Sequence, residues 1–181
     1  ADYLYYDFID GVSVDPDRTE NRNSYYQAIS DEGQIVAFSS TAMTGFAAGN
    51  NTGSWQTYIK DYNTGEITPI SLTSDGSFAN SASFMAEISG NGRYVFYASA
   101  ASNLDAGQDG GGYGIFRHDL ESGNTILVSS AADGTPGSGT DYYPKASDDG
   151  RYVAFWSTSN NLSSSDTSSD WDLCLKDIDT G

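Results

Sequence analysis

The stretch Ser30-Asp31-Glu32-Gly33-Gln34-Ile35-Val36-Ala37-Phe38 occurs three times in this chain. It returns as Ser89-Gly90-Asn91-Gly92-Arg93-Tyr94-Val95-Phe96-Tyr97 and as Ser147-Asp148-Asp149-Gly150-Arg151-Tyr152-Val153-Ala154-Phe155, with steps of 59 and 58 residues between the equivalent glycines. A second motif, Tyr58 to Gly65, returns as Phe116 to Gly123 and as Cys174 to Gly181, each time after 58 residues. A fixed period of this length indicates a protein built from one repeated supersecondary unit.

Each unit has the sequence pattern of four short strands. An Asp-Gly or Asn-Gly pair beside a run of β-branched and aromatic residues predicts a hairpin, because these turn residues adopt positive φ at low cost. We therefore expect strands at about 24–30 and 34–40, joined by a turn at Asp31 to Gly33. A second turn at Asn63 to Gly65 joins strands at about 55–62 and 66–72. Apolar residues never recur at helical spacing over ten residues, so the sequence predicts an all-β chain.

Four-stranded units in tandem are typical of the blades of a β-propeller. We expect a partial blade at 1–23, complete blades at 24–81 and 82–140, and a partial blade at 141–181. The expected strands amount to roughly three blades, whereas a closed ring needs at least about four. We therefore expect either a segment of a longer protein or, if the chain is complete, a head-to-tail homodimer. A two-sheet sandwich is the alternative, but it does not explain the period.

The repeats also carry a family resemblance. The Ser-Asp-x-Gly-Arg-Tyr-Val-Ala-Phe and Lys-Asp-x-x-Thr-Gly motifs, together with the Ser159-Asn160-Asn161-Leu162 stretch and the Asp-rich loop after it, resemble the WD40-like PD40 repeats of TolB-type bacterial propellers. The resemblance implies a ring of about six to eight blades. It also implies a periplasmic or extracellular location in a bacterium. Such propellers serve as binding platforms or are attached to an enzymatic domain elsewhere.

Composition excludes several classes of partner. The 25 acidic and 8 basic residues give a net charge of −17, which repels phosphate backbones and anionic lipid. We expect no nucleic-acid partner and no direct membrane insertion, since no apolar run approaches the roughly 20 residues of a bilayer span. Cys174 is the single cysteine, so no internal disulfide can form.

Long loops between the second and third strands are the expected binding elements. They cover about 41–54, 100–112 and 158–170. Each has an early apolar anchor and a late aromatic residue; the anchors are Phe46, Leu104 and Leu162, and the aromatics are Trp55, Tyr113 and Trp171. Tyrosine and tryptophan offer rigid amphipathic surface to a partner. We predict that the three late aromatics contact a ligand; the alternative is that they belong to the core.

The third loop holds a candidate metal site. Asp166, Asp170 and Asp172 follow one another at steps of four and two residues, similar to an Asp-rich loop of the resembled family. Calcium takes six to eight oxygen ligands, which such a loop can supply. The alternative is that these carboxylates are solvated turn residues, because the other two repeats carry different residues at the Asp166 and Asp172 positions.

No catalytic constellation stands out. His118 replaces Lys60 and Lys176 of the other repeats, and Cys174 replaces aromatic residues, so both are expected to be structural. The aspartates that recur in every unit, Asp61, Asp119 and Asp177, are expected to cap turns by accepting backbone N–H groups.

The sequence therefore predicts a non-enzymatic binding or scaffold module. It would recognise a protein or a glycan through loops at one rim, assisted by calcium. The alternative is the propeller part of a hydrolase or carbohydrate-active enzyme whose catalytic residues lie outside this segment.

Overall fold

The computed structural model describes residues 23–41, 46, 50, 53–104, 112–166 and 168–181, which form antiparallel sheets and no helix. The expected partial blade at 1–23 lies outside these residues except for Asn23. The strands are β1 (Ser24–Ile29), β2 (Ile35–Ser40), β3 (Gln56–Asp61), β4 (Ile67–Pro69), β5 (Ser83–Ile88), β6 (Tyr94–Ser99), β7 (Gly114–Asp119), β8 (Thr125–Leu127), β9 (Asp141–Ala146), β10 (Tyr152–Ser157) and β11 (Asp172–Asp177).

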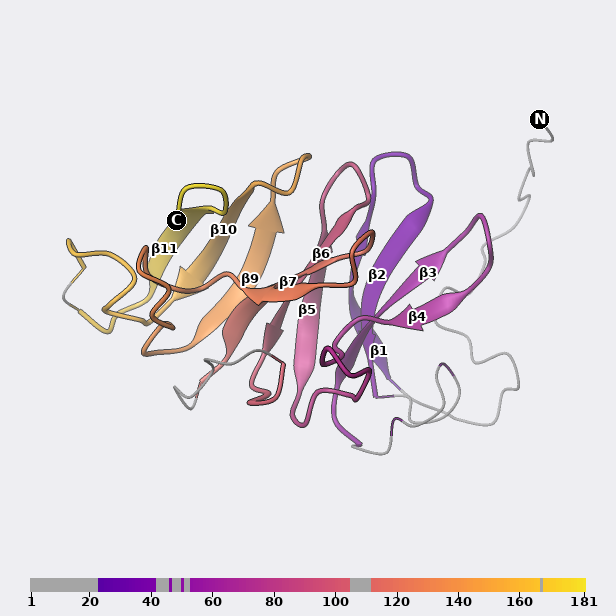
Figure 1. Cartoon of the computed structure of the whole chain (residues 1–181), viewed down its shortest axis with the longest axis horizontal. Coiled ribbons are helices and arrows are strands. Elements are labelled where there is room, and N and C mark those ends of the chain that lie inside the picture. The colour runs from indigo at the N-terminus through magenta and orange to yellow at the C-terminus, as the bar shows by residue number, and fades with distance from the viewer. Residues whose placement is uncertain (1–22, 42–45, 47–49, 51–52, 105–111, 167) are drawn as a thin grey trace.

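The strands form three meander sheets, one for each repeat. β1 to β4 make a four-stranded sheet, β5 to β8 a second one, and β9 to β11 a three-stranded sheet, each with its strands in sequence order. We call them blade 1, blade 2 and blade 3. Figure 1 shows the three sheets side by side, with blade 2 between the other two. This arrangement confirms the expected β-propeller segment and excludes a two-layer sandwich.

The first hairpin forms as the sequence predicts. Ile29 pairs with Val36 across it, and the turn is closed by the Gly33 N–H, which donates to the Ser30 carbonyl at 2.8 Å. Gly33 has a φ of 70°, a conformation that glycine adopts without strain. The same hairpin is repeated in blades 2 and 3.

The fourth strands are shorter than expected. We expected the fourth strand of blade 1 to cover 66–72, but β4 ends at Pro69. The Ser71 hydroxyl, rather than a ladder carbonyl, accepts the Thr57 N–H at 3.1 Å. This side chain replaces the backbone partner of the third strand, so regular pairing stops early.

The hydrophobic core lies between the blades. Strand β5 packs against β1 and β2, and β9 packs against β5 and β6. Along β6, Val95 and Tyr97 belong to the cluster shared with blade 1, while Phe96 and Ala98 belong to the cluster shared with blade 3. Because successive side chains of a strand point to opposite faces, one strand serves two interfaces. Most buried apolar side chains of the described residues therefore lie in clusters that two blades share.

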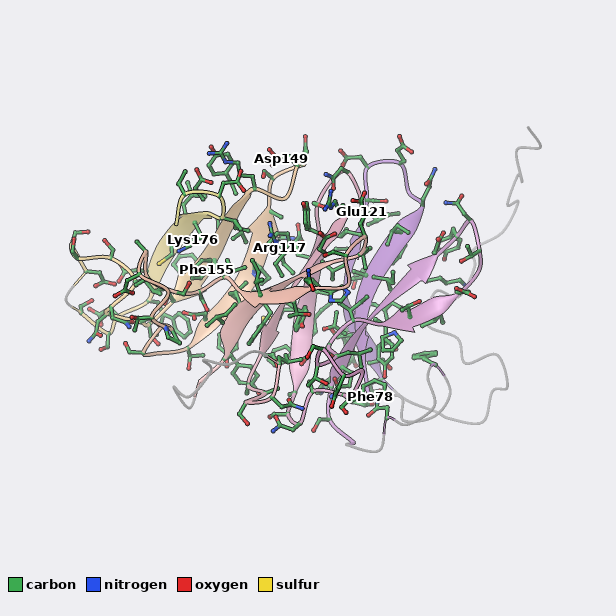
Figure 2. The ribbon with its side chains drawn as sticks, viewed as in Figure 1. Phe78, Arg117, Glu121, Asp149, Phe155 and Lys176 are labelled. Atoms are coloured by element: carbon green, nitrogen blue, oxygen red, sulfur yellow. The ribbon has the colours of Figure 1, made fainter. Side chains whose placement is uncertain are left out.

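The two ends of the blades differ. We call the end that carries the β1–β2, β5–β6 and β9–β10 hairpins the turn end, and the opposite end, where the long connections leave and enter the sheets, the loop end (Figure 1). Figure 2 shows Glu121 and Asp149 at the turn end and Phe78 at the loop end. Among the described residues there is no helix that could span a membrane.

Candidate functional site

The candidate site lies at the loop end, where first and third strands begin. The Ser83 N–H at the start of β5 donates to the carbonyl of Trp55 at 2.7 Å, and the Asp141 N–H at the start of β9 donates to the carbonyl of Tyr113 at 2.7 Å. Each bond joins one blade to the next. The residue before a third strand is therefore held beside the first strand of the following blade.

This junction produces a continuous row of aromatic rings across all three blades. Ring centroids are 5.7 Å apart for Tyr25 and Trp55, 5.0 Å for Phe84 and Tyr113, and 5.8 Å for Tyr142 and Trp171. The pairs are linked to one another because Tyr26 lies 5.6 Å from Phe84, which lies 6.2 Å from Tyr142. The members of this aromatic row are Tyr25, Tyr26, Trp55, Phe84, Tyr113, Tyr142, Tyr143 and Trp171.

A bulge in each first strand shapes the row. Tyr26, Met85 and Tyr143 occupy equivalent positions and have φ values of 58°, 58° and 55°. The ladder shifts register beside each of them. A bulge re-aims the side chains of its strand, and left-handed backbone at a bulky residue is strained. The same strained conformation recurs in three repeats because the surrounding packing holds it in place. Residues with strained backbone cluster at functional sites.

Part of the row is open to solvent. The exposed fraction is 56% for Tyr25, 58% for Tyr143 and 51% for Trp171. A hollow of about 390 Å³ is lined by Tyr25, Tyr26, Trp55, Ala82, Phe84 and Tyr113. Its wall is thus mostly aromatic and spans blades 1 and 2.

The hydroxyl of Tyr142 stays protonated within this row. Burial raises the pKa of Tyr142, and the neighbouring Tyr113 and Tyr143 raise it further. A neutral phenol can donate a hydrogen bond to a ligand as well as accept one.

The three aromatics proposed from the sequence all lie in the row. Trp55 and Tyr113 are half-buried, whereas Trp171 is exposed. Their role in ligand binding stays a prediction. Sequence reasoning missed their partners Tyr25, Phe84 and Tyr142, although these recur at steps of 59 and 58 residues and were available as a repeat signal.

The three aspartates proposed as calcium ligands do not converge. The Asp166 carboxylate accepts the Ser168 N–H at 3.0 Å, and the Asp170 N–H donates to the Ser168 hydroxyl at 3.3 Å. Asp172 begins β11 opposite Ser157. Within the described ranges no group of three acidic, histidine or cysteine side chains is placed to hold a metal ion. Calcium binding stays a prediction.

A second hollow, of about 660 Å³, lies along β11. Asp166, Asp172 and Cys174 all line it. Burial raises the pKa of the Cys174 thiol, and Asp141, Asp166 and Asp172 raise it further. A thiol in this environment is mostly protonated at neutral pH, which makes it a poor nucleophile.

The loop anchors and the polar repeat residues have the expected structural roles. Phe46 packs edge-on against Phe38 and Tyr58, and Leu104 is buried in the cluster between blades 1 and 2. Parts of these loops, 42–45, 47–49, 51–52, 105–111 and 167, lie outside the described residues. His118 makes a 2.9 Å hydrogen bond with the Thr125 hydroxyl, and burial lowers its pKa.

The recurring aspartates cap turns as predicted. Asp61, Asp119 and Asp177 each accept the N–H of the residue two positions later, at 2.7, 3.0 and 3.1 Å. Two of them, Asp119 and Asp177, also bind arginine, which the repeated motifs did not indicate.

Comparison with known proteins identifies the fold. No protein-family model matches the chain, and no curated protein matches it in sequence. A solved structure assigned as TolB, from Agrobacterium tumefaciens, superposes with a TM-score of 0.55 at 19% identity, covering 90% of this chain and 48% of that one. A prolyl endopeptidase superposes with a TM-score of 0.50 at 16% identity, covering 86% of this chain and 20% of that one. The chain thus spans about half the length of the TolB structure and a fifth of the peptidase, and its fold is that of a TolB-like β-propeller.

Proposed function

We propose that this chain is a non-enzymatic binding or scaffold module that recognises a protein partner through the aromatic row. The carrying observation is the row itself: eight rings linked by ring-to-ring contacts, contributed by three blades and partly exposed at one end. Tyrosine and tryptophan are enriched where interfaces carry most of their binding energy. The fold of a TolB protein supports the proposal.

Two variants of exposed rings test the proposal without disturbing the core. Trp171→Ser and Tyr25→Ser remove rings that are 51% and 56% exposed. Tyr152→Ser is the matched control, because it removes a ring that is 40% exposed at the turn end. Unchanged melting temperatures would establish that all three variants fold.

A displayed random-peptide library and a glycan array, screened with the 181-residue chain, supply the ligands. We expect selected peptides that bind the wild type and the control but bind the two row variants at least tenfold more weakly. Glycans that show this pattern would instead support the glycan alternative. Ligands that bind every variant equally, or no ligand at all, would overturn the row as a recognition surface.

The enzyme alternative rests on the likeness to a prolyl endopeptidase. There the chain would be the propeller part of a hydrolase or a carbohydrate-active enzyme, with the catalytic residues outside it. The sequence of the complete gene separates the two: an adjoining catalytic domain favours the alternative.

Three finer predictions accompany the proposed function. We propose a periplasmic or extracellular location in a bacterium, assistance by calcium bound through Asp166, Asp170 and Asp172, and head-to-tail association of two copies if the chain is complete. Fractionation of the source cells tests the proposed location.

A further inference from the structure

Charge is distributed unevenly between the two ends of the blades. The connections between the strands leave and enter the sheets at the loop end; their described residues include four aspartates, Asp75, Asp133, Asp166 and Asp170, and no lysine, arginine, histidine or glutamate. The lysines and arginines of the described residues lie instead on strands or in turn-end hairpins; they are Lys60, Arg93, Arg117, Lys145, Arg151 and Lys176. Within the described residues, the side chains of these connections therefore carry only negative charge, and the one cation that reaches them is Lys176, whose ammonium donates to the Ser130 carbonyl at 2.9 Å.

Away from the loop end, the chain places its own cations over tyrosine rings. Arg93 and Arg117 lie 4.9 and 4.5 Å from the ring centroid of Tyr94, and Arg151 lies 5.0 Å from that of Tyr152. A cation within about 6 Å of a ring face is attracted by the ring quadrupole. Within the described residues, no lysine or arginine takes such a position over the aromatic row.

The spacing between neighbouring rings of the row is slightly shorter than the two-residue repeat of an extended chain. Neighbouring centroids along it are separated by 5.0 Å at the closest and 6.5 Å at the farthest. Side chains on one face of an extended segment recur every two residues, or about 6.6 Å. Alternate residues of an extended segment can thus meet successive rings.

Resting on the proposed function, we propose that the aromatic row binds an extended protein segment with lysine or arginine at alternate positions. The cationic side chains lie over the ring faces, and the aspartates of the loop end balance their charge. Tyrosine hydroxyls of the row bind polar groups of the segment. The partner is therefore basic where it meets this surface, whatever its overall fold.

A twelve-residue peptide of alternating arginine and serine is the probe. Fluorescence anisotropy with the 181-residue chain compares it with the same peptide carrying citrulline, which keeps the shape of arginine without its charge, and with one carrying glutamate. A neutral proline-rich peptide serves as a fourth probe. We expect the arginine peptide to bind at least tenfold more tightly than the others, and its affinity to fall as salt rises.

Variants of the row distinguish the contribution of the aromatic rings to peptide binding from that of the acidic charge. Trp171→Leu and Tyr25→Leu keep an apolar side chain but remove the ring. Each should weaken binding of the arginine peptide about fivefold. Tyr152→Leu at the turn end should leave affinity unchanged. Asp170→Asn should weaken binding and reduce its salt dependence.

The outcomes distinguish the two proposals. Equal binding of the arginine and citrulline peptides, or arginine-peptide affinity that the leucine variants leave unchanged, would overturn the basic-segment inference. Row-dependent binding of the proline-rich peptide alone would also overturn it while leaving the proposed function intact. If no peptide from either experiment binds in a row-dependent way, the proposed function itself fails.

Discussion

The guanidinium of Arg93 binds the carboxylate of Asp119 through two hydrogen bonds, Nε to Oδ1 at 3.0 Å and Nη2 to Oδ2 at 2.8 Å. Arg151 and Asp177 repeat this geometry in blade 3, at 2.8 and 2.7 Å. Paired bonds of this kind fix the orientation of both groups. They tie the end of the third strand to the hairpin of the same blade.

Replacing Arg93 with glutamine, the residue that blade 1 carries at position 34, tests the pair. The arginine bonds hold the pKa of Asp119 well below its usual range. The pair therefore stabilises the fold above about pH 4 and loses this effect as pH falls through the lowered pKa. Arg93→Gln should lower the melting temperature modestly at pH 7 and by less at pH 2.5, where part of the effect of the pair is already lost. The converse change, Gln34→Arg, should add an ion pair with Asp61 and raise the melting temperature. If the melting temperatures of the wild type and Arg93→Gln have the same pH dependence, the Arg93–Asp119 pair does not stabilise the fold.

Gly90 is needed where the turn ends of three blades meet. Its carbonyl accepts the Asp31 N–H at 3.0 Å. A Cβ at Gly90 would lie 2.5 Å from Asp31 Oδ2 and 3.1 Å from the Cα of Asp148. We expect Gly90→Ala to lower the free energy of unfolding by about 1–3 kcal/mol. Each kcal/mol should lower the Tm by roughly 2–4 °C. Adding Asp31→Ala should recover part of the loss, and a fully stable Gly90→Ala protein would show that the turns are not in contact.

The arginine–aspartate pairs and the Gly90 contact show which parts of the structure could be predicted from the sequence. Asp-Gly turns and the period predicted the hairpins and the order of the sheets, because both depend on local backbone preference. The arginine pairs were hidden because Gln34 breaks their repetition in blade 1. The contact at Gly90 depends on how closely neighbouring blades approach, which no local pattern records.

The aromatic row was half predictable for a related reason. Trp55, Tyr113 and Trp171 stand at the ends of long loops, where aromatic residues attract notice. Tyr25, Phe84 and Tyr142 stand inside first strands, where alternation alone suggests ordinary core residues. The bulge beside them interrupts that alternation. Only the packing of adjacent blades brings the two sets together.

Asp141 makes stability depend on pH in the opposite direction. It is buried, 1% exposed, and accepts a hydrogen bond from the Ser159 hydroxyl at 3.3 Å. Burial raises the pKa of its carboxyl from 3.8. The protonated form is therefore favoured in the fold, and its contribution is lost as pH rises above about 4 through the raised pKa. Asp141→Ser, which reproduces Ser83 of blade 2, should melt a few degrees higher than wild type at pH 8 and not at pH 4. A variant less stable at both values would contradict this.

Calcium assistance predicts a ligand-dependent melting temperature. An ion bound only by the folded chain raises stability by mass action, about 2.7 kcal/mol at a hundred times its Kd. Melting the 181-residue chain in millimolar calcium and in chelator should thus give different midpoints. Asp166→Asn with Asp170→Asn should abolish the difference. Equal midpoints for the wild type in both solutions would dismiss calcium.

The outer face of blade 3 predicts self-association of this chain. Trp156 and Leu173 are paired across β10 and β11 and are 45% and 65% exposed, and Leu175 is 72% exposed. In blade 2 the equivalents of the first two, Ala98 and Ile115, are fully buried against blade 3. The exposed apolar face is therefore the one that packs against a following blade, and an exposed patch of this kind marks an interface.

A second copy meeting this face with its blade 1 would make a head-to-tail contact. Sedimentation velocity over about 1 to 100 µM should show a rising average sedimentation coefficient for the 181-residue chain. Leu173→Ser with Leu175→Ser should suppress the rise. Ile29→Ser should weaken it too, because Ile29 is 61% exposed on blade 1 and its blade 2 equivalent, Ile88, packs toward the preceding blade. If a longer natural polypeptide supplies the next blade, the longer protein should sediment as a monomer while the 181-residue chain associates. A chain that stays monomeric at every concentration would mean that the exposed leucines and tryptophan form no interface between copies.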